Sequence, residues 1–85
     1  MHFFTVGQKD RFPLVLLHGW GLSGEKYREL ASILSRHFFV LVPDFPGFGN
    51  SEPLKKPWTI EEYVRSVKMF LDAQQIPLCL LVGHS

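Results

Sequence analysis

The stretch that decides the fold of this chain is Leu78-Cys79-Leu80-Leu81-Val82-Gly83-His84-Ser85. Its apolar run is typical of a buried strand, and it leads directly into Gly83-His84-Ser85. A strand that ends on Gly-x-Ser forms the first half of the Gly-x-Ser-x-Gly turn, which holds a serine hydroxyl exposed at the end of a sheet. We therefore interpret Ser85 as a candidate nucleophile, with Gly83 and His84 shaping its turn.

The composition is that of one small globular domain. The chain has 85 residues, 46% of them hydrophobic, and a net charge of +1, which gives no electrostatic reason to expect nucleic acid or an anionic membrane. No apolar run approaches the ~18 residues of a membrane span, and the N-terminus lacks the features of a signal peptide. The single cysteine, Cys79, excludes a disulfide framework or a cysteine metal cluster. We expect a cytoplasmic protein.

Three apolar runs predict the strands of a parallel sheet. They cover residues 14–17, 38–42 and 78–82, and none alternates with polar residues, so each is expected to be buried on both faces. Between them, apolar residues recur at helical spacing over residues 27–34 and 60–71. The order predicts two consecutive right-handed βαβ units. Residues 2–6 are a candidate for an earlier strand.

The second predicted helix carries a clear start signal. Thr59 and Glu62 have the spacing of a capping box, and Trp58 and Tyr63 stand where a hydrophobic staple lies. Pro77 blocks further helix before the third apolar run.

The loop after the first strand allows two interpretations. Gly19, Gly21 and Gly24 match Gly-x-Gly-x-x-Gly between a strand and a helix, and Asp44 follows at the distance of a ribose-binding acid, so the spacing fits a dinucleotide site. Alternatively, His18-Gly19-Trp20-Gly21 is an oxyanion-hole loop, in which the glycines let a backbone N–H point at a developing oxyanion. The second interpretation requires a serine at the end of the third strand, where Ser85 stands.

Three motifs, in this order, resemble those of the α/β-hydrolase fold family, in its esterase-like branch. They are His18-Gly19-Trp20-Gly21, then Pro43-Asp44-Phe45-Pro46-Gly47-Phe48-Gly49-Asn50-Ser51, then Gly83-His84-Ser85. The middle motif resembles the family's Asp-x-Pro-Gly-x-Gly-x-Ser loop, which a dinucleotide-binding domain does not need. The resemblance runs from about Pro13 to Ser85 and favours the hydrolase interpretation.

The resemblance implies an α/β fold. It is a truncated α/β-hydrolase three-layer sandwich, with a parallel sheet of about three strands, the first of them in the middle, and two crossover helices. Residues 1–85 would form the N-terminal part of a single α/β-hydrolase domain.

The resemblance also assigns roles to residues. Ser85 matches the nucleophile, and Trp20 matches the oxyanion-hole donor through its backbone N–H. The residues that support the site are His18, Gly19, Gly21, Asp44, Gly83 and His84. The implied substrate is a small-molecule carboxylic ester or related acyl compound, because family members that cleave epoxides or carbon–halogen bonds use an aspartate nucleophile and usually carry proline in place of Gly21. Neither a metal nor an organic cofactor is implied.

The general base is the missing part. In the family the triad runs Ser, then Asp or Glu, then His, so both partners would lie beyond residue 85. His18 matches a structural histidine, His84 should point away from the serine hydroxyl, His37 precedes a strand, and His2 is near the terminus. We therefore expect no useful hydrolase activity from this chain alone.

Two further hypotheses stay open at this point. The chain could be a non-catalytic remnant that binds a partner, or a small dinucleotide-binding unit that uses Gly19, Gly21, Gly24 and Asp44. Whichever hypothesis holds, the third strand of this chain should present an unprotected edge, through which self-association is possible.

Overall fold

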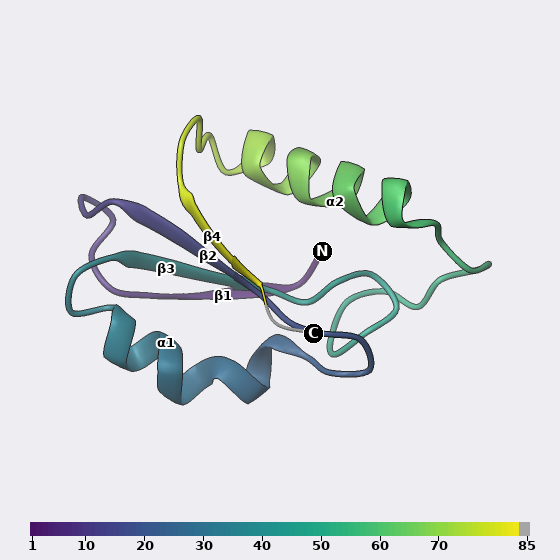
Figure 1. The fold of residues 1–85 in the computed structure, drawn as a ribbon, viewed down its shortest axis with the longest axis horizontal. Helices are drawn as coiled ribbons and strands as arrows, with labels where there is room; N and C mark the ends of the chain where they lie inside the picture. The colour runs from purple at the N-terminus through teal and green to yellow at the C-terminus, as the bar shows by residue number, and fades with distance from the viewer. Residues whose placement is uncertain (84–85) are drawn as a thin grey trace.

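The computed structural model describes residues 1–83, and its elements follow the predicted order with one added strand (Figure 1). The elements are β1 (Phe3–Val6), β2 (Pro13–Leu17), the 3₁₀ helix η1 (Gly24–Tyr27), α1 (Arg28–Leu34), β3 (Phe39–Pro43), α2 (Ile60–Ala73) and β4 (Leu80–Gly83). The candidate strand at residues 2–6 is thus confirmed as β1.

The sheet has four strands in the order β1-β3-β2-β4. β2 pairs in parallel with both β3 and β4, so the first of the three predicted strands lies in the middle, as expected. The expected parallel sheet of about three strands is incomplete, however, because β1 adds to β3 in the antiparallel direction, with Phe3 opposite Pro43 and Val6 opposite Val40. The sheet is therefore mixed.

The two helices cover opposite faces of the sheet, which makes three layers (Figure 1). Along β2, Leu14 and Leu16 point into the core beneath α1 with Ala31, whereas Val15 points into the core beneath α2 with Phe70. This is the alternation that a strand buried on both faces requires. The predicted burial of the first two apolar runs on both faces is confirmed.

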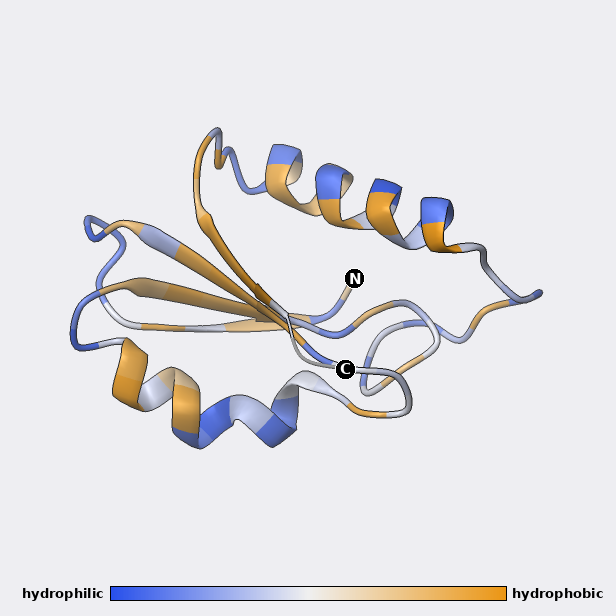
Figure 2. Ribbon diagram, in the orientation of Figure 1, coloured by the Kyte–Doolittle hydropathy of each residue, from blue (hydrophilic) through white to orange (hydrophobic). Residues whose placement is uncertain are grey.

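The expected burial of the third apolar run is wrong for the part of the chain that the structure describes. Leu80, Leu81 and Val82 in β4 are 46%, 55% and 42% exposed. Figure 2 shows β4 as an apolar strand at the margin of the sheet. Its one strand neighbour in the described sheet is β2. Phe70 is the one buried residue of α2, so this helix gives β4 little cover.

Both ends of α2 are fixed by local signals. The predicted capping box is present, with the Thr59 side chain accepting from the Glu62 N–H and the Glu62 side chain accepting from the Thr59 N–H. Trp58 packs edge-on against Tyr63 at 5.2 Å between ring centroids, as the staple predicts. The helix ends at Ala73, well before Pro77, because Gln75 adopts a left-handed backbone (φ 57°).

Candidate active site

The loops after the parallel strands converge at one edge of the sheet. β2 ends at Leu17, whose register partner in β4 is Gly83. β3 ends at Pro43 and is followed directly by Asp44. Since the carboxyl ends of parallel strands lie at the same edge, this register brings the His18–Gly21 loop beside the end of β4. His84 and Ser85 themselves lie outside the described residues.

His18 is a buried connector between two loops. Its side chain is 4% exposed, and its Nε2 accepts the N–H of Phe45 at 2.9 Å. Because Nε2 accepts, the ring proton is on Nδ1, which donates to the Gly19 carbonyl at 2.9 Å. Both ring nitrogens are therefore used in holding the loops after β2 and β3 together, and the geometry gives His18 no free nitrogen to act as a general base.

Trp20 lies at the tip of a tight turn. The N–H of Leu22 donates to the carbonyl of Gly19 at 3.2 Å, and Gly21 has φ +76°, the geometry of a type II turn with glycine in its third position. Within residues 1–83, the Trp20 N–H donates to no protein acceptor. An N–H at the carboxyl end of a central strand that is not used by the described fold is the feature that an oxyanion donor needs.

Asp44 ties three segments together from a buried position, 4% exposed. Its Oδ1 accepts the N–H of Gly24 at 2.6 Å, and its Oδ2 accepts the N–H of Asn50 at 3.0 Å. The Ser51 hydroxyl donates to the Asp44 carbonyl at 2.6 Å and in turn accepts the N–H of His2 at 2.9 Å. The carboxylate thus fixes the start of η1 and the Gly-x-Gly-x-Ser loop at the site edge.

Gly49 allows the loop to approach this carboxylate. Its φ is +53°, and a Cβ at this position would lie 2.5 Å from Cγ of Asp44. Gly24 is similarly close, since a Cβ there would lie 2.8 Å from Cγ1 of Val42. Gly21 differs, because its positive φ needs glycine although a Cβ would meet nothing within 4 Å.

An aromatic cluster borders the Trp20 turn, and the sequence patterns did not indicate it as part of the site. Trp20 packs edge-on against Phe48 at 5.1 Å between ring centroids and lies 6.4 Å from Tyr63. Phe45 lies 5.5 Å from Tyr63 and 5.0 Å from His18. Phe45 and Phe48 lie within the motif at residues 43–51, but Tyr63 comes from α2. The sequence indicated Tyr63 only as the staple partner of Trp58, which does not predict its contact with Trp20.

A family model of the alpha/beta hydrolase fold matches residues 13–85. The chain belongs to this family. The α/β-hydrolase motifs of the sequence therefore occur in the fold that gives them their usual arrangement, with the glycine loop after a central strand and the Asp44 loop beside it.

Among curated relatives, the chain is 36% identical over 73 residues to a pimeloyl-[acyl-carrier protein] methyl ester esterase of Pseudoalteromonas atlantica, covering 85% of this chain and 28% of that protein. It is 44% identical over 59 residues to a soluble epoxide hydrolase of a Corynebacterium species, covering 69% of this chain and 19% of that protein. The chain thus spans less than a third of the length of these two relatives.

Solved structures agree with this assignment. An enol-lactonase from Burkholderia xenovorans superimposes with a TM-score of 0.93 at 30% identity, over 99% of this chain and 33% of that one. A marine microorganism esterase gives a TM-score of 0.92 at 27% identity, over 99% of this chain and 31% of that one.

In this α/β-hydrolase, the contacts of Asp44 give no support to the dinucleotide hypothesis. Both carboxylate oxygens already accept backbone N–H groups, those of Gly24 and Asn50. A ribose-binding acid must also be open to the sugar hydroxyl, whereas Asp44 is 4% exposed. The Gly24 N–H, which would face a phosphate in a dinucleotide site, instead donates to Asp44.

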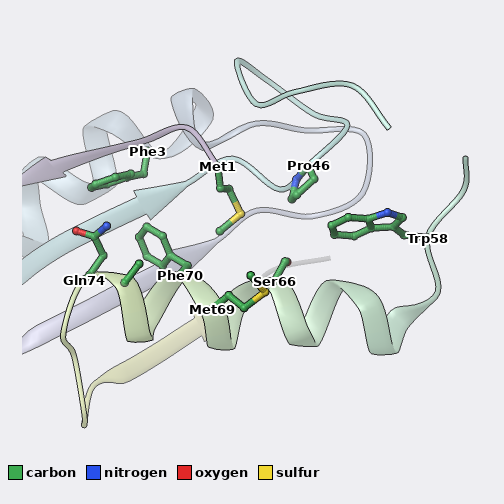
Figure 3. A pocket seen from close by; sticks show the side chains of 9 residues that line it. Met1, Phe3, Pro46, Trp58, Ser66, Met69, Phe70 and Gln74 are labelled. Carbon is green, nitrogen blue, oxygen red and sulfur yellow. The ribbon is translucent and has the colours of Figure 1, made fainter. Parts of the chain in front are cut away.

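One apolar cavity has none of the predicted site residues in its lining (Figure 3). It has a volume of about 320 Å³ and lies between α2 and the start of the chain, where Met1, Phe3, Trp58 and Met69 line it. Since none of the site residues predicted from the sequence lines it, we assign the candidate site to the β2 edge instead.

Other groups add little chemistry to the site. Burial raises the pKa of the Cys79 thiol, which is opposite to the shift that activates a cysteine nucleophile. Over residues 1–83, no three His, Cys, Asp or Glu side chains are grouped to hold a metal ion. No helix among residues 1–83 has the length and apolar character needed to cross a membrane.

Proposed function

We propose that this chain is the nucleophile-bearing part of a serine hydrolase that cleaves carboxylic esters or related acyl compounds. The observation that supports it best is the Trp20 turn, whose N–H has no protein acceptor within residues 1–83, beside the strand that leads into Gly83-His84-Ser85. Similarity to a methyl ester esterase over 85% of the chain favours the same chemistry.

In this proposal, the Ser85 hydroxyl oxygen attacks the ester carbonyl carbon and gives its proton to a base. The carbonyl oxygen becomes an oxyanion, which the Trp20 N–H helps to stabilise. The alcohol then leaves with a proton returned by the base, and water hydrolyses the acyl-enzyme. The proposed roles of His18, Gly19, Gly21 and Asp44 are to hold the donor turn in place, and those of Gly83 and His84 are to shape the serine turn.

We assign no general base to residues 1–83. His18 has both ring nitrogens engaged, and His37 lies before β3, at the opposite end of the sheet. A serine hydroxyl without a base is a weak nucleophile. We therefore propose that these 85 residues alone do not turn over esters, and that a triad acid and histidine must come from additional polypeptide.

Two assays separate the parts of this proposal. With p-nitrophenyl butyrate as substrate, the 85-residue chain should give a rate no higher than its Ser85→Ala variant. Turnover that disappears in Ser85→Ala would support the nucleophile and refute the claim of inactivity.

A chimera tests the nucleophile directly. Residues 13–85 replace the matching segment of the related methyl ester esterase, which supplies the remaining fold. The chimera should hydrolyse p-nitrophenyl butyrate, lose at least a thousandfold in kcat on Ser85→Ala, and leave styrene oxide intact. If the chimera with Ser85 is folded by circular dichroism and still does not hydrolyse the ester, the proposal is contradicted.

A non-catalytic role is the second candidate, and the exposed apolar edge at β4 favours it specifically. Under this hypothesis, the chain binds a second copy of itself or another protein through β4. It predicts an inactive chimera together with association of the 85-residue chain in solution.

A further inference from the structure

The Trp20 side chain lies beside a small aromatic pocket that the steps proposed above do not use. The pocket has a volume of about 130 Å³ and is lined by His18, Gly19, Trp20, Phe45, Phe48 and Tyr63. It therefore opens beside the same turn that presents the Trp20 N–H. A second, wider groove of about 350 Å³ adjoins it and shares Trp20, Phe48 and Tyr63.

The Trp20 ring is 80% exposed, although an indole is among the most costly side chains to leave in water. Phe48 contacts this ring at one edge, with 5.1 Å between centroids, and leaves most of its surface uncovered. A large aromatic ring held at the mouth of an apolar pocket offers surface that a ligand can bury.

The lining determines the chemistry of the ligand. Among the described residues, no Asp, Glu, Lys or Arg side chain lines the small pocket, and the same holds for the groove beside it. The His18 ring is engaged at both nitrogens, and the Tyr63 hydroxyl donates to the Pro46 carbonyl at 3.5 Å. A charged group would lose its hydration there without a partner, so the pocket favours an uncharged group.

The volume of the pocket limits the size of the group that it can bind. An apolar cavity of roughly 150 Å³ accepts one benzene molecule. A pocket of about 130 Å³ therefore fits a single phenyl ring or a short branched alkyl group, and edge-to-face packing against Phe48 and Tyr63 suits a ring. The adjoining groove leaves a path for the rest of the molecule.

We propose that Trp20, Phe48 and Tyr63 form a binding pocket for an uncharged apolar substituent of the substrate, about as large as one phenyl ring. This rests on the proposed ester hydrolysis for its biological meaning. Trp20 then serves twice, with its N–H at the carbonyl oxygen and its indole against the substituent. The substituent can be carried by the acyl carbon or by the alcohol oxygen, which two esters distinguish.

Binding to the 85-residue chain tests the pocket without requiring catalysis. The chain has two tryptophans, so two indole N–H signals are expected by NMR, and Trp20→Phe identifies the one that belongs to Trp20. Methyl benzoate should shift the Trp20 signal saturably, and benzoate ion at the same concentration should not. Shifts confined to Trp58, or equal shifts with benzoate, would overturn the proposal.

Variants make the test specific. Trp20→Ala keeps the backbone N–H and, because the ring is exposed, should keep the fold, yet it should weaken methyl benzoate binding at least fivefold by calorimetry. Tyr63→Leu, which keeps an apolar side chain in α2, should weaken it similarly. Phe12→Ala is the matched control, since Phe12 is a half-exposed aromatic residue at the other end of β2, and it should leave the affinity unchanged. Equal loss in all three variants would refute the pocket.

The chimera separates this proposal from the proposed function. Methyl benzoate carries its ring on the acyl side and phenyl acetate on the alcohol side, so comparing them shows which side the pocket holds. Trp20→Ala should lower kcat/KM for one of the two esters by at least five times more than for the other. An inactive chimera with intact methyl benzoate binding retains the pocket and rejects the hydrolase. An active chimera whose Trp20→Ala variant loses equally on both esters, and on methyl acetate, retains the hydrolase and rejects the pocket.

Discussion

At the scale of single residues, Asp44 is the side chain on which the site loops most depend. Its carboxylate is buried and accepts the N–H of Gly24, at the start of η1, and the N–H of Asn50, in the loop after β3. Hydrogen bonds to a buried charged group are worth more than neutral ones, and losing one leaves a buried donor unpaired. The stability of the site edge therefore rests on one carboxylate.

Asp44→Asn tests this dependence. The amide keeps one acceptor oxygen but turns an NH₂ group toward the other N–H, so we expect the free energy of unfolding to fall by about 2 kcal/mol in urea titrations. The exposed Asp10→Asn is the matched control and should change stability by less than about 0.5 kcal/mol. Equal effects of the two substitutions would mean that the Asp44 contacts do not stabilise the loops.

Cys79 provides a pH-dependent prediction. Burial raises the pKa of its thiol, so the folded state favours the neutral form. As pH rises past about 8.5, the unfolded chain gains a thiolate that the fold resists, so this contribution to stability is lost above that pH and is constant below it. Iodoacetamide should alkylate the folded chain with a pH midpoint above that of the chain in urea. Coinciding midpoints would contradict the burial effect.

Local backbone features were predictable from the sequence where a motif encodes them. The turns predicted in the Trp20 loop and the Asp44 loop need glycine, and Gly21, Gly47 and Gly49 have the positive φ that such turns require. The partners of Asp44 and the pairing of Trp20 with Tyr63 were not predictable, because they join segments that meet only after the sheet forms. No local pattern specifies which aromatic ring will face a turn from another element.

At the scale of elements, the helix α2 was predictable at its start and not at its end. Thr59 and Glu62 encode the N-terminus by their spacing, and the structure has that box. At the C-terminus, the Ile76 N–H donates to the Leu71 carbonyl and the Gln75 N–H to the Asp72 carbonyl. This is a Schellman motif with glutamine where glycine is usual, so the usual sequence signal was absent.

Gln75→Gly should therefore stabilise the protein. Gln75 has φ 57°, a conformation that costs an L-residue about 1 kcal/mol and costs glycine almost nothing. We expect the free energy of unfolding to rise by about 0.5–1 kcal/mol in thermal or urea melts. Gln74→Gly, one residue earlier at φ −85°, is the matched control and should destabilise slightly. A loss of stability in Gln75→Gly would show that this cap is not strained.

At the scale of the whole molecule, the helices cover the middle strands of the sheet but leave the edge strand β4 exposed. β2 and β3 are buried between the two helices, whereas β4 presents apolar residues along the margin. The sequence predicted the parallel strands from their apolar runs, but could not place β1, whose antiparallel pairing with β3 depends on where β3 lies. The pattern of apolar residues predicts that a segment is a strand but does not predict which strand it pairs with.

The bare margin predicts association of the 85-residue chain. An unpaired apolar strand edge that carries neither a charged residue nor proline is a template for pairing with a second chain. β4 has neither from Leu80 to Gly83. Sedimentation velocity should show a weight-average mass that rises with concentration. Leu81→Lys places a charge on this edge, at a side chain that is 55% exposed, and should return the chain to monomer. Ile33→Lys makes the same charge change at a 53% exposed residue of α1 and should leave association intact. If both variants behave alike, net charge rather than the β4 edge governs the association.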